Sequence, residues 1–330
     1  MKTYDSILDL VGRTPLLRLR TGIPPDGPKA FVKLEFLNPT GSIKDRMCHH
    51  IIMKAMKSAE LKPGDTVIDN TSGNTGSALA MVASVMGLKA ILVTPEKTSQ
   101  EKVDLIKSYG AEVIVTPEDA LHHDPEGCYM VARRLAKENG YFDLNQYDSQ
   151  DNVESHYVST GPEIYEDTDG KVTHFVAGIG TGGTFSGAAR YLKDRNPDIK
   201  AIAVDPEGSI FAEYIMHNKE IEGYAYKVEG IGSDVVTKAM HPDVVDEVVT
   251  VSDKDSFTRA RLVAREEGIC GGGSSGSVAF AMEQIAQRLG PDDLIVGIFA
   301  DAGIRYLSKC FNDAWMQRHG YLPKMEARGR

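Results

Sequence analysis

Residues 174–187 read HFVAGIGTGGTFSG, an apolar run followed by a turn of glycine and threonine and then by a helical pattern. Glycines let a backbone approach an anion closely, and a helix N-terminus supplies free N–H donors and a favourable dipole. Read from Gly180, the turn is neither a Walker loop nor a G-x-G-x-x-G dinucleotide fingerprint. The segment therefore predicts a buried strand that ends in a phosphate cup, with a turn that needs glycine only for its backbone as the alternative. The cup comprises Gly180, Thr181, Gly182, Gly183 and Thr184.

Short β-rich runs alternate with helical patterns along the rest of the chain, which is typical of an α/β fold with parallel sheets covered by helices. Strands are expected at residues 31–35, 66–69, 90–94, 112–116, 174–178, 201–205, 247–251 and 294–299. Helices are expected at residues 44–59, 75–86, 99–109, 125–138, 184–193, 254–267, 276–288 and 306–315. Ligands of such sheets bind at the carboxyl ends of strands, so the chemistry should lie in the strand-to-helix turns.

The composition excludes several classes of function. The 330 residues carry 37 basic and 47 acidic side chains, a net charge of −10, and no Lys/Arg-rich run, so we expect no nucleic-acid partner. Apolar stretches are shorter than the roughly 18 residues of a membrane span, and residues 1–10 do not resemble a secretory signal. The four cysteines lie far apart, as in neither a disulfide framework nor a zinc site. We therefore expect a cytoplasmic protein with no membrane partner and no metal.

Two further turns follow the same strand-to-helix pattern. Residues 71–76 read TSGNTG, and consecutive N–H and hydroxyl groups that point one way can form a nest for a carboxylate. Ser, Thr and Asn are also good helix caps, so an ordinary N-cap is the alternative. Residues 271–277 read GGGSSGS, where the backbone either approaches a ligand closely or forms a flexible hinge.

The segment 39–46, PTGSIKDR, places Lys44 just inside a predicted helix N-terminus. The helix dipole favours anions there, so this lysine has an easier route to the neutral amine that Schiff-base chemistry needs. The alternative is a solvated lysine whose charge is offset by Asp45. Taken alone, the segment favours that second interpretation.

The order of these four turns is more specific than any one of them. Lysine turn, Ser-Gly-Asn turn, glycine-threonine cup and glycine-serine loop, in this order, resemble the β-family (fold type II) of pyridoxal-phosphate enzymes from residue 7 to residue 322. Within that family the chain resembles the cystathionine β-synthases most, with the cysteine synthases close behind. The finer likeness is carried by DPE at 124–126, DPEGSI at 205–210, VEGIG at 228–232, DAWM at 313–316 and GYL at 320–322.

The resemblance implies an architecture. We expect an α/β fold with two open, twisted, mostly parallel sheets flanked by helices, as in the tryptophan synthase β-like enzymes. A larger domain, residues 1–45 plus 151–330, would bind the cofactor phosphate. A smaller, mobile domain, residues 46–150, would bind the substrate carboxylate, and its closure would exclude water. A homodimer is expected from the family alone.

The resemblance also assigns roles residue by residue. Lys44 matches the lysine that binds pyridoxal 5′-phosphate as an internal aldimine and then removes the substrate Cα proton. Asn74 matches the residue beside the cofactor 3′-oxygen, and Ser274 the residue that meets the pyridine nitrogen. Gly180 to Thr184 match the phosphate cup. The positions that match the substrate side are Thr71, Ser72, Thr75 and Gln146 for the carboxylate, with Tyr147 lining the same side.

The implied chemistry is a β-replacement on L-serine or an activated serine. A neutral serine hydroxyl does not force protonation of the ring nitrogen, so elimination to an aminoacrylate is favoured, followed by addition of a nucleophile. The leading hypothesis is that serine and homocysteine give cystathionine and water. Ser233 stands where cystathionine β-synthases usually have tyrosine, which weakens this finer assignment.

Other functions stay open. A cysteine synthase would use O-acetylserine and sulfide, and another β-replacement would use an amine or a different thiol. A cofactor-retaining but inactive binding or regulatory subunit is disfavoured because Lys44, Asn74 and Ser274 are all present. A nucleotide-binding Rossmann protein is disfavoured by the loop spacing.

Overall fold

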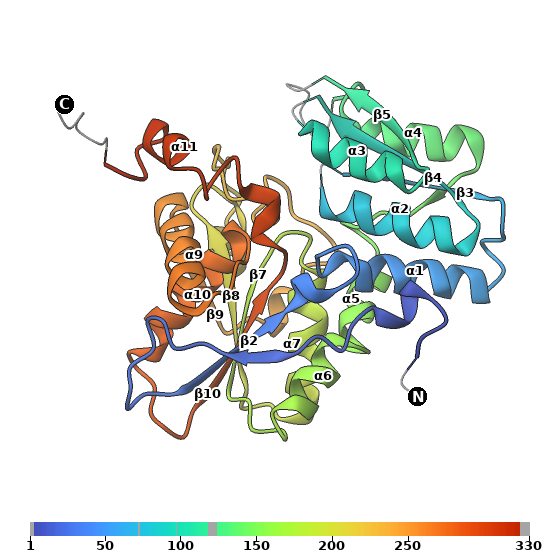
Figure 1. The fold of residues 1–330 in the computed structure, drawn as a ribbon. Helices are drawn as coiled ribbons and strands as arrows, with labels where there is room; N and C mark the ends of the chain where they lie inside the picture. Colours follow the sequence, from blue (N-terminus) through green and yellow to red (C-terminus); the bar gives the residue numbers. More distant parts are fainter. Residues whose placement is uncertain (1–2, 72, 97, 118–123, 324–330) are drawn as a thin grey trace.

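The computed structural model describes residues 3–71, 73–96, 98–117 and 124–323, which form two open sheets with helices on both faces (Figure 1). The larger sheet has the strand order β1-β2-β10-β7-β8-β9, and only β1 runs antiparallel to its neighbour. Its strands are β1 (Leu16–Arg18), β2 (Lys29–Leu34), β7 (His174–Gly178), β8 (Lys200–Pro206), β9 (Glu247–Val251) and β10 (Leu294–Phe299). The smaller, all-parallel sheet has the order β5-β4-β3-β6. Its strands are β3 (Thr66–Asn70), β4 (Lys89–Pro95), β5 (Glu112–Thr116) and β6 (Phe142–Asp143).

Helices cover both faces of each sheet. On the larger sheet, α9 (Asp253–Glu267) and α10 (Gly273–Ala286) pack on one face, and α6 (Thr160–Asp167) and α7 (Gly183–Arg195) pack on the other. On the smaller sheet, α1 (Lys44–Lys57), α2 (Asn74–Met86) and α3 (Gln100–Ser108) face α4 (Cys128–Asn139) across the strands. Helix α5 (Gln150–Tyr157) contacts both α1 and α7. No helix in these described ranges is long and apolar enough to cross a membrane.

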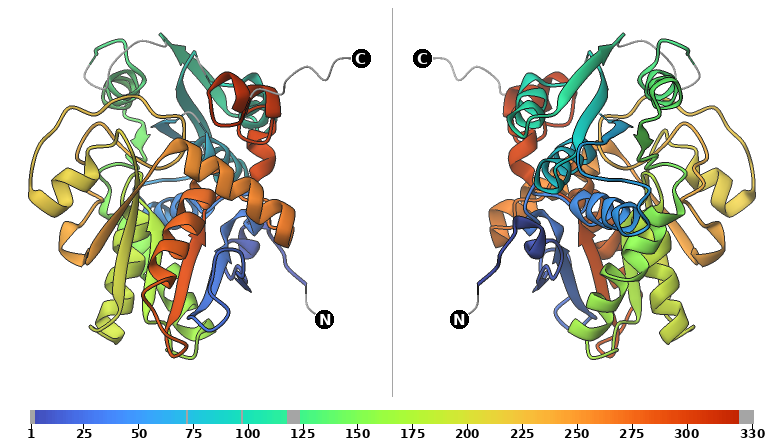
Figure 2. Two further views of the ribbon diagram at one scale, coloured as in Figure 1. Left: turned by 90° about the vertical axis from the view of Figure 1, so that its left-hand side faces the viewer. Right: turned by 90° about the vertical axis from the view of Figure 1, so that its right-hand side faces the viewer.

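The remaining helices lie outside these layers. Figure 2 shows α8 (Phe211–His217) at the periphery in both side views, and α11 (Asp313–Arg318) follows the last strand. Short 3-10 helices occur as η1 (Ile7–Leu10), η2 (Glu35–Leu37), η3 (Pro242–Val244) and η4 (Gly303–Tyr306).

Strand β8 shows why the sequence folds into buried parallel sheets. Ile202 and Val204 point into the core under α9 and α10, whereas Ala201 and Ala203 point into the core under α6 and α7. Since successive side chains of a strand alternate between faces, a strand covered on both faces must be apolar throughout. The predicted α/β fold with two mostly parallel, helix-flanked sheets is confirmed.

Most of the predicted helices and strands are present, and the prediction of one helix is wrong. The short strands β1 and β6 and the helices α5, α6 and α8 were not predicted. The single helix predicted at 306–315 is instead η4 followed by turns and α11. The new helix begins because the Asn312 side chain accepts a hydrogen bond from the Trp315 N–H at 2.9 Å. The intervening turn is fixed by the Arg261 guanidinium, which donates to the Cys310 carbonyl at 3.0 Å.

A buried ionic network joins α1 to the larger sheet. Arg46 of α1 contacts Glu35 and Glu163, each at 2.7 Å, and the fully buried Lys33 of β2 contacts Glu163 at 2.9 Å. Burial alone would raise the pKa of Glu163, but Arg46, with Lys33, outweighs burial and lowers that pKa to about 2. Glu163 therefore stays ionised in the folded chain at pH values where a free carboxylate would be protonated.

This network predicts an acid-sensitive contribution to stability. Between about pH 4.5 and pH 2 the unfolded chain binds one more proton than the folded chain at Glu163, so the free energy of unfolding falls as the pH falls. Glu163→Gln should remove about 1 kcal/mol per pH unit from this slope. Urea denaturation between pH 3 and pH 5 measures it, with Glu166→Gln on the exposed side of α6 as the matched control. An unchanged slope in Glu163→Gln would contradict the assignment.

The close packing of α5 against α7 generates a second prediction. A Cβ atom at Gly187 would lie 2.1 Å from the Val153 carbonyl oxygen, so Gly187→Ala must push the two helices apart. We expect a loss of about 1–3 kcal/mol from overpacking, measured as a lower urea midpoint. Gly290→Ala is the control, because a Cβ there meets nothing within 4 Å. Equal midpoints for the two variants would refute the prediction.

Candidate active site

The lysine turn is held against the end of β10. The Ile43 N–H donates to the Ala300 carbonyl at 2.9 Å, which anchors the residue directly before Lys44. The Asp45 carboxylate accepts hydrogen bonds from the Thr40 N–H, at 2.7 Å, and from its hydroxyl. Helix α1 begins at Lys44, as the sequence predicts, so the lysine is fixed at the point where α1 leaves the larger sheet.

The surroundings of Lys44 favour its neutral amine. Burial lowers the pKa of Lys44, and the opposing attraction of Cys48 and Asp301 does not restore the ordinary value. Among the described residues, no carboxylate lies within 4 Å of its Nζ. A neutral lysine amine is the form that attacks a carbonyl carbon.

The loop after β3 brings together most of the predicted carboxylate-binding residues. The Thr75 hydroxyl donates to the Gln146 side-chain oxygen at 2.8 Å, and the Gln146 amide donates to the Asn70 carbonyl at 3.0 Å. Thr71 lines the same cavity as Lys44. Ser72 lies outside the described residues. The two segments, separated by about 70 residues in sequence, therefore form one polar wall.

Asp301 is a site residue that the sequence analysis missed. Its carboxylate accepts hydrogen bonds from the Asn74 amide at 2.7 Å and from the Tyr306 hydroxyl at 2.6 Å. Burial raises the pKa of Asp301, against the lowering effect of these two donors. Its position two residues after a predicted strand is the signal that could have found it, because ligands gather at carboxyl ends of strands.

The glycines of the predicted cup are required by packing. A Cβ at Gly180 would lie 2.6 Å from the Gly230 carbonyl oxygen, and one at Gly183 would lie 2.2 Å from the Asn152 side-chain oxygen. Gly182 adopts a positive φ of 90°. The backbone explanation for these glycines therefore holds. The cup nevertheless sits at the N-terminus of α7, where the first N–H groups have no partner within the helix.

Helix α5 supports the cup from behind. The Asn152 amide donates to the Thr181 hydroxyl at 3.0 Å, and His156 Nε2 lies 3.1 Å from the Thr184 hydroxyl. Burial lowers the pKa of His156 well below its usual value, so this imidazole is neutral. His156 is buried, and its ring contacts a hydroxyl of the cup.

One cavity of about 420 Å³ and a smaller one that adjoins it hold nearly all the predicted site residues. The larger cavity is lined by Lys44, Thr71, Asn74, Thr75, Gln146, Tyr147, Gly180 and Thr181. The smaller cavity is lined by Lys44, Gly180, Thr181, Gly182, Thr184 and Ser274. Gly183 lines neither of them. Ser274 lies in the first turn of α10, which begins three residues earlier than predicted.

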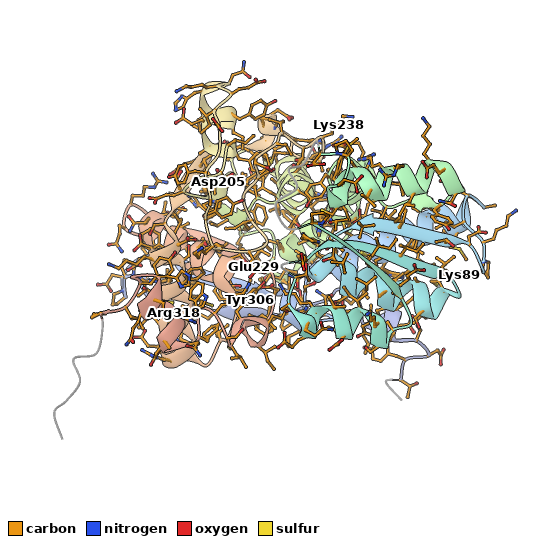
Figure 3. All side chains as sticks on the ribbon, turned by 90° about the horizontal axis from the view of Figure 1, so that it is seen from above. Lys89, Asp205, Glu229, Lys238, Tyr306 and Arg318 are labelled. Atoms are coloured by element: carbon orange, nitrogen blue, oxygen red, sulfur yellow. The ribbon has the colours of Figure 1, made fainter. Side chains whose placement is uncertain are left out.

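The cavity wall also contains residues that the sequence analysis did not assign to the site. Lys102, Tyr226 and Tyr306 line the larger cavity, as does the segment 228–232. Figure 3 shows Glu229 and Tyr306 near one another where the two halves of the molecule meet. Ser233 does not line either cavity; its N–H donates to the Ser209 hydroxyl at 3.0 Å.

These cavities fit pyridoxal 5′-phosphate. That molecule needs a neutral lysine amine for its aldehyde, N–H and hydroxyl donors for its phosphate, and a partner for its ring nitrogen. Lys44, the cup at the start of α7 and Ser274 lie around the smaller cavity and would supply these three groups. A Cβ at Gly180 or Gly182 would displace the surrounding chain.

Comparison with known proteins agrees with this fit. A family model described as "Pyridoxal-phosphate dependent enzyme" matches residues 7–301. The chain is 42% identical to a cystathionine β-synthase of Apis mellifera over 97% of its own length and 64% of that protein. It is 38% identical to a cysteine synthase of Staphylococcus aureus, over 93% of its own length and 96% of that protein. A crystal structure of O-ureido-L-serine synthase superimposes with a TM-score of 0.86 and 32% identity, covering 96% of this chain and 99% of that one.

The share of each relative's length that this chain covers differs. A cystathionine β-synthase of Rattus norvegicus is 43% identical over 97% of this chain but only 58% of that protein. The chain thus spans about three fifths of the length of these cystathionine β-synthases. It spans nearly all of the cysteine synthase and of the O-ureido-L-serine synthase.

Proposed function

Because this chain belongs to the family of pyridoxal-phosphate-dependent enzymes, of the cystathionine β-synthase and cysteine synthase group, we propose that it joins L-serine to L-homocysteine. In this β-replacement the Cβ–O bond of serine breaks, a Cβ–S bond forms, and the thiol proton leaves with the hydroxyl group as water. The products are cystathionine and water. The observation that carries the proposal is the convergence of Lys44, the cup, Ser274 and the carboxylate-binding wall around joined cavities.

Each site residue has a part in this proposal. When bound, the cofactor withdraws electrons from the substrate Cα–H bond. Lys44 takes the Cα proton, because burial lowers its pKa and so favours the neutral amine that can act as a base. Thr71, Thr75 and Gln146 bind the substrate carboxylate, and Tyr147 lines the substrate side.

The remaining residues hold the cofactor. The cup and the N-terminus of α7 would bind the phosphate, and the Ser274 hydroxyl would bind the ring nitrogen without supplying a charge. Asn74 would hold the 3′-oxygen, and Asp301 orients the Asn74 amide through the 2.7 Å hydrogen bond.

We also propose the division into two domains that the sequence analysis expects. Residues 46–150, with the smaller sheet, would move toward residues 1–45 plus 151–330 and exclude water from the cavity. Separate apolar cores under the two sheets support this division. The homodimer rests on the family resemblance alone, and the cytoplasmic location on the wide spacing of the cysteines.

A cysteine synthase activity, with O-acetylserine and sulfide, is the second candidate. It is favoured by the Staphylococcus aureus relative, 96% of whose length this chain covers. The structural similarity to O-ureido-L-serine synthase keeps a nucleophile other than sulfur open.

The identity of the product separates these candidates. The holoenzyme is given serine, O-acetylserine, homocysteine and sulfide together, with carbon label on only one of the two amino-acid donors, and the products are identified by mass. We expect cystathionine labelled from serine. Cysteine as the main product would move the chain to the cysteine synthases. No labelled product of any kind would refute β-replacement on serine.

A variant of Lys44 tests the central assignment. Lys44→Ala should abolish turnover and leave the cofactor bound only non-covalently, because Lys44 lines both cavities, whereas Lys102 lines only the larger one and is held in an ion pair with Glu229. Visible absorbance and intact-protein mass after borohydride reduction measure the covalent link. Lys57→Ala, an exposed lysine at the far end of α1, is the matched control. Full activity in Lys44→Ala would overturn the proposed mechanism.

A further inference from the structure

Two opposite charges lie side by side in the wall of the larger cavity. Lys102 of α3 donates to the Glu229 carboxylate at 2.7 Å, and both residues line the cavity that contains Lys44. Lys309, after η4, contacts the other oxygen of Glu229 from the outer side and does not line this cavity. The pair therefore presents one ammonium and one carboxylate to whatever enters.

The pair lies next to the carboxylate-binding loop. The Lys102 Nζ is 3.6 Å from the place that a Cβ on Gly73 would occupy, between Thr71 and Asn74. The same Nζ lies 5.8 Å from the centre of the Tyr306 ring, which also lines the cavity. Charges at this position can reach a molecule that approaches a substrate already held by Thr71.

Both members of the pair are accessible from the cavity. The Lys102 side chain is 13% exposed and the Glu229 side chain 31%, and both line the larger cavity. Burial opposes ionisation of Glu229, but Lys102 and Lys309 outweigh it and lower the pKa, so the carboxylate is charged at neutral pH. With two lysines around one carboxylate, the cluster has a net charge of +1.

We propose that Lys102 and Glu229 select the second substrate, which is an α-amino acid with a thiol on its side chain. Lys102 binds its α-carboxylate and Glu229 binds its α-ammonium, so the thiol is directed inward toward the first substrate. This inference rests on the proposed β-replacement and adds the two residues that distinguish its nucleophile from other thiols. Sulfide and a simple thiol have neither an α-carboxylate nor an α-ammonium group, so the pair cannot bind either of them through both of its charges.

Four thiols of related length separate the two charges of the ligand. L-Homocysteine carries both groups, 4-mercaptobutyrate only the carboxylate, 3-mercaptopropylamine only the ammonium, and 1-propanethiol neither. The kcat/KM of the holoenzyme for each thiol, at saturating serine, is divided by the value for 1-propanethiol. In the wild type we expect this ratio to be highest for homocysteine.

Two variants should have crossed effects on these ratios. Lys102→Met should lower the ratio for 4-mercaptobutyrate about tenfold and should not lower the ratio for 3-mercaptopropylamine. Glu229→Gln should do the reverse, and each should lower the ratio for homocysteine about tenfold. Lys309→Met is the matched control, because it removes the outer partner of the same carboxylate. It should change each ratio less than twofold.

The alternative is that the pair only ties α3 to the segment 228–232. In that case Lys102→Met and Glu229→Gln would change the kcat/KM for all four thiols by the same factor. The ratios to 1-propanethiol would then stay at their wild-type values, which would overturn the inference. A wild type that accepts sulfide alone would overturn it as well. Exchange of the serine Cα proton in deuterated water, measured by mass, separates the two levels. If the serine Cα proton does not exchange, the proposed function itself fails. If it exchanges but the ratios of the variants equal those of the wild type, only the role of Lys102 and Glu229 in selecting the nucleophile fails.

Discussion

The backbone pairing between the lysine turn and the end of β10 is the constraint on which the rest of the site depends. Ser42 pairs with Asp301 as an isolated antiparallel bridge, and the adjacent Ile43 N–H bonds to Ala300. This contact places Lys44 at the carboxyl edge of the larger sheet, while α1 itself packs among the helices of the smaller sheet. Asp301 continues the connection, because its carboxylate holds Asn74 at the start of α2. The lysine turn is thus linked to both sheets: directly to the end of β10, and through Asp301 to Asn74 at the start of α2.

Electrostatics and packing act together at that point. Burial makes the Lys44 amine easier to deprotonate, whereas the charge of Arg46, two residues further on, is compensated by Glu35 and Glu163. Arg46 and Glu35 remain ionised because each is paired, whereas Lys44 has no such partner among the described residues. Helix α1 therefore carries two basic side chains with different roles: Arg46 anchors the helix through its paired charge, and Lys44 offers an amine for chemistry.

The residues predicted from sequence share a local signal, and those missed do not. Lys44, Asn74, the cup and Ser274 each lie at a turn before a helix, where residue type and spacing report the backbone. Asp301 lies 227 residues from Asn74, and Glu229 lies 127 residues from Lys102, so only the fold brings these partners together. The predicted helix at 306–315 failed for the same reason, since the Arg261 contact that holds the turn comes from α9. The two sheets themselves follow from apolar runs buried on both faces.

The packing of the cup glycines has a consequence for how the cofactor is acquired. The backbone at Gly180, Gly182 and Gly183 is shaped by contacts with Gly230, Met240 and Asn152, all of which belong to the protein. The shape of this proposed phosphate site is therefore fixed by folding and would not have to be imposed by the phosphate. A preorganised site loses little conformational entropy on binding, so more of the interaction energy is retained as affinity. We therefore expect the folded chain to bind its cofactor without rearranging the backbone of the cup.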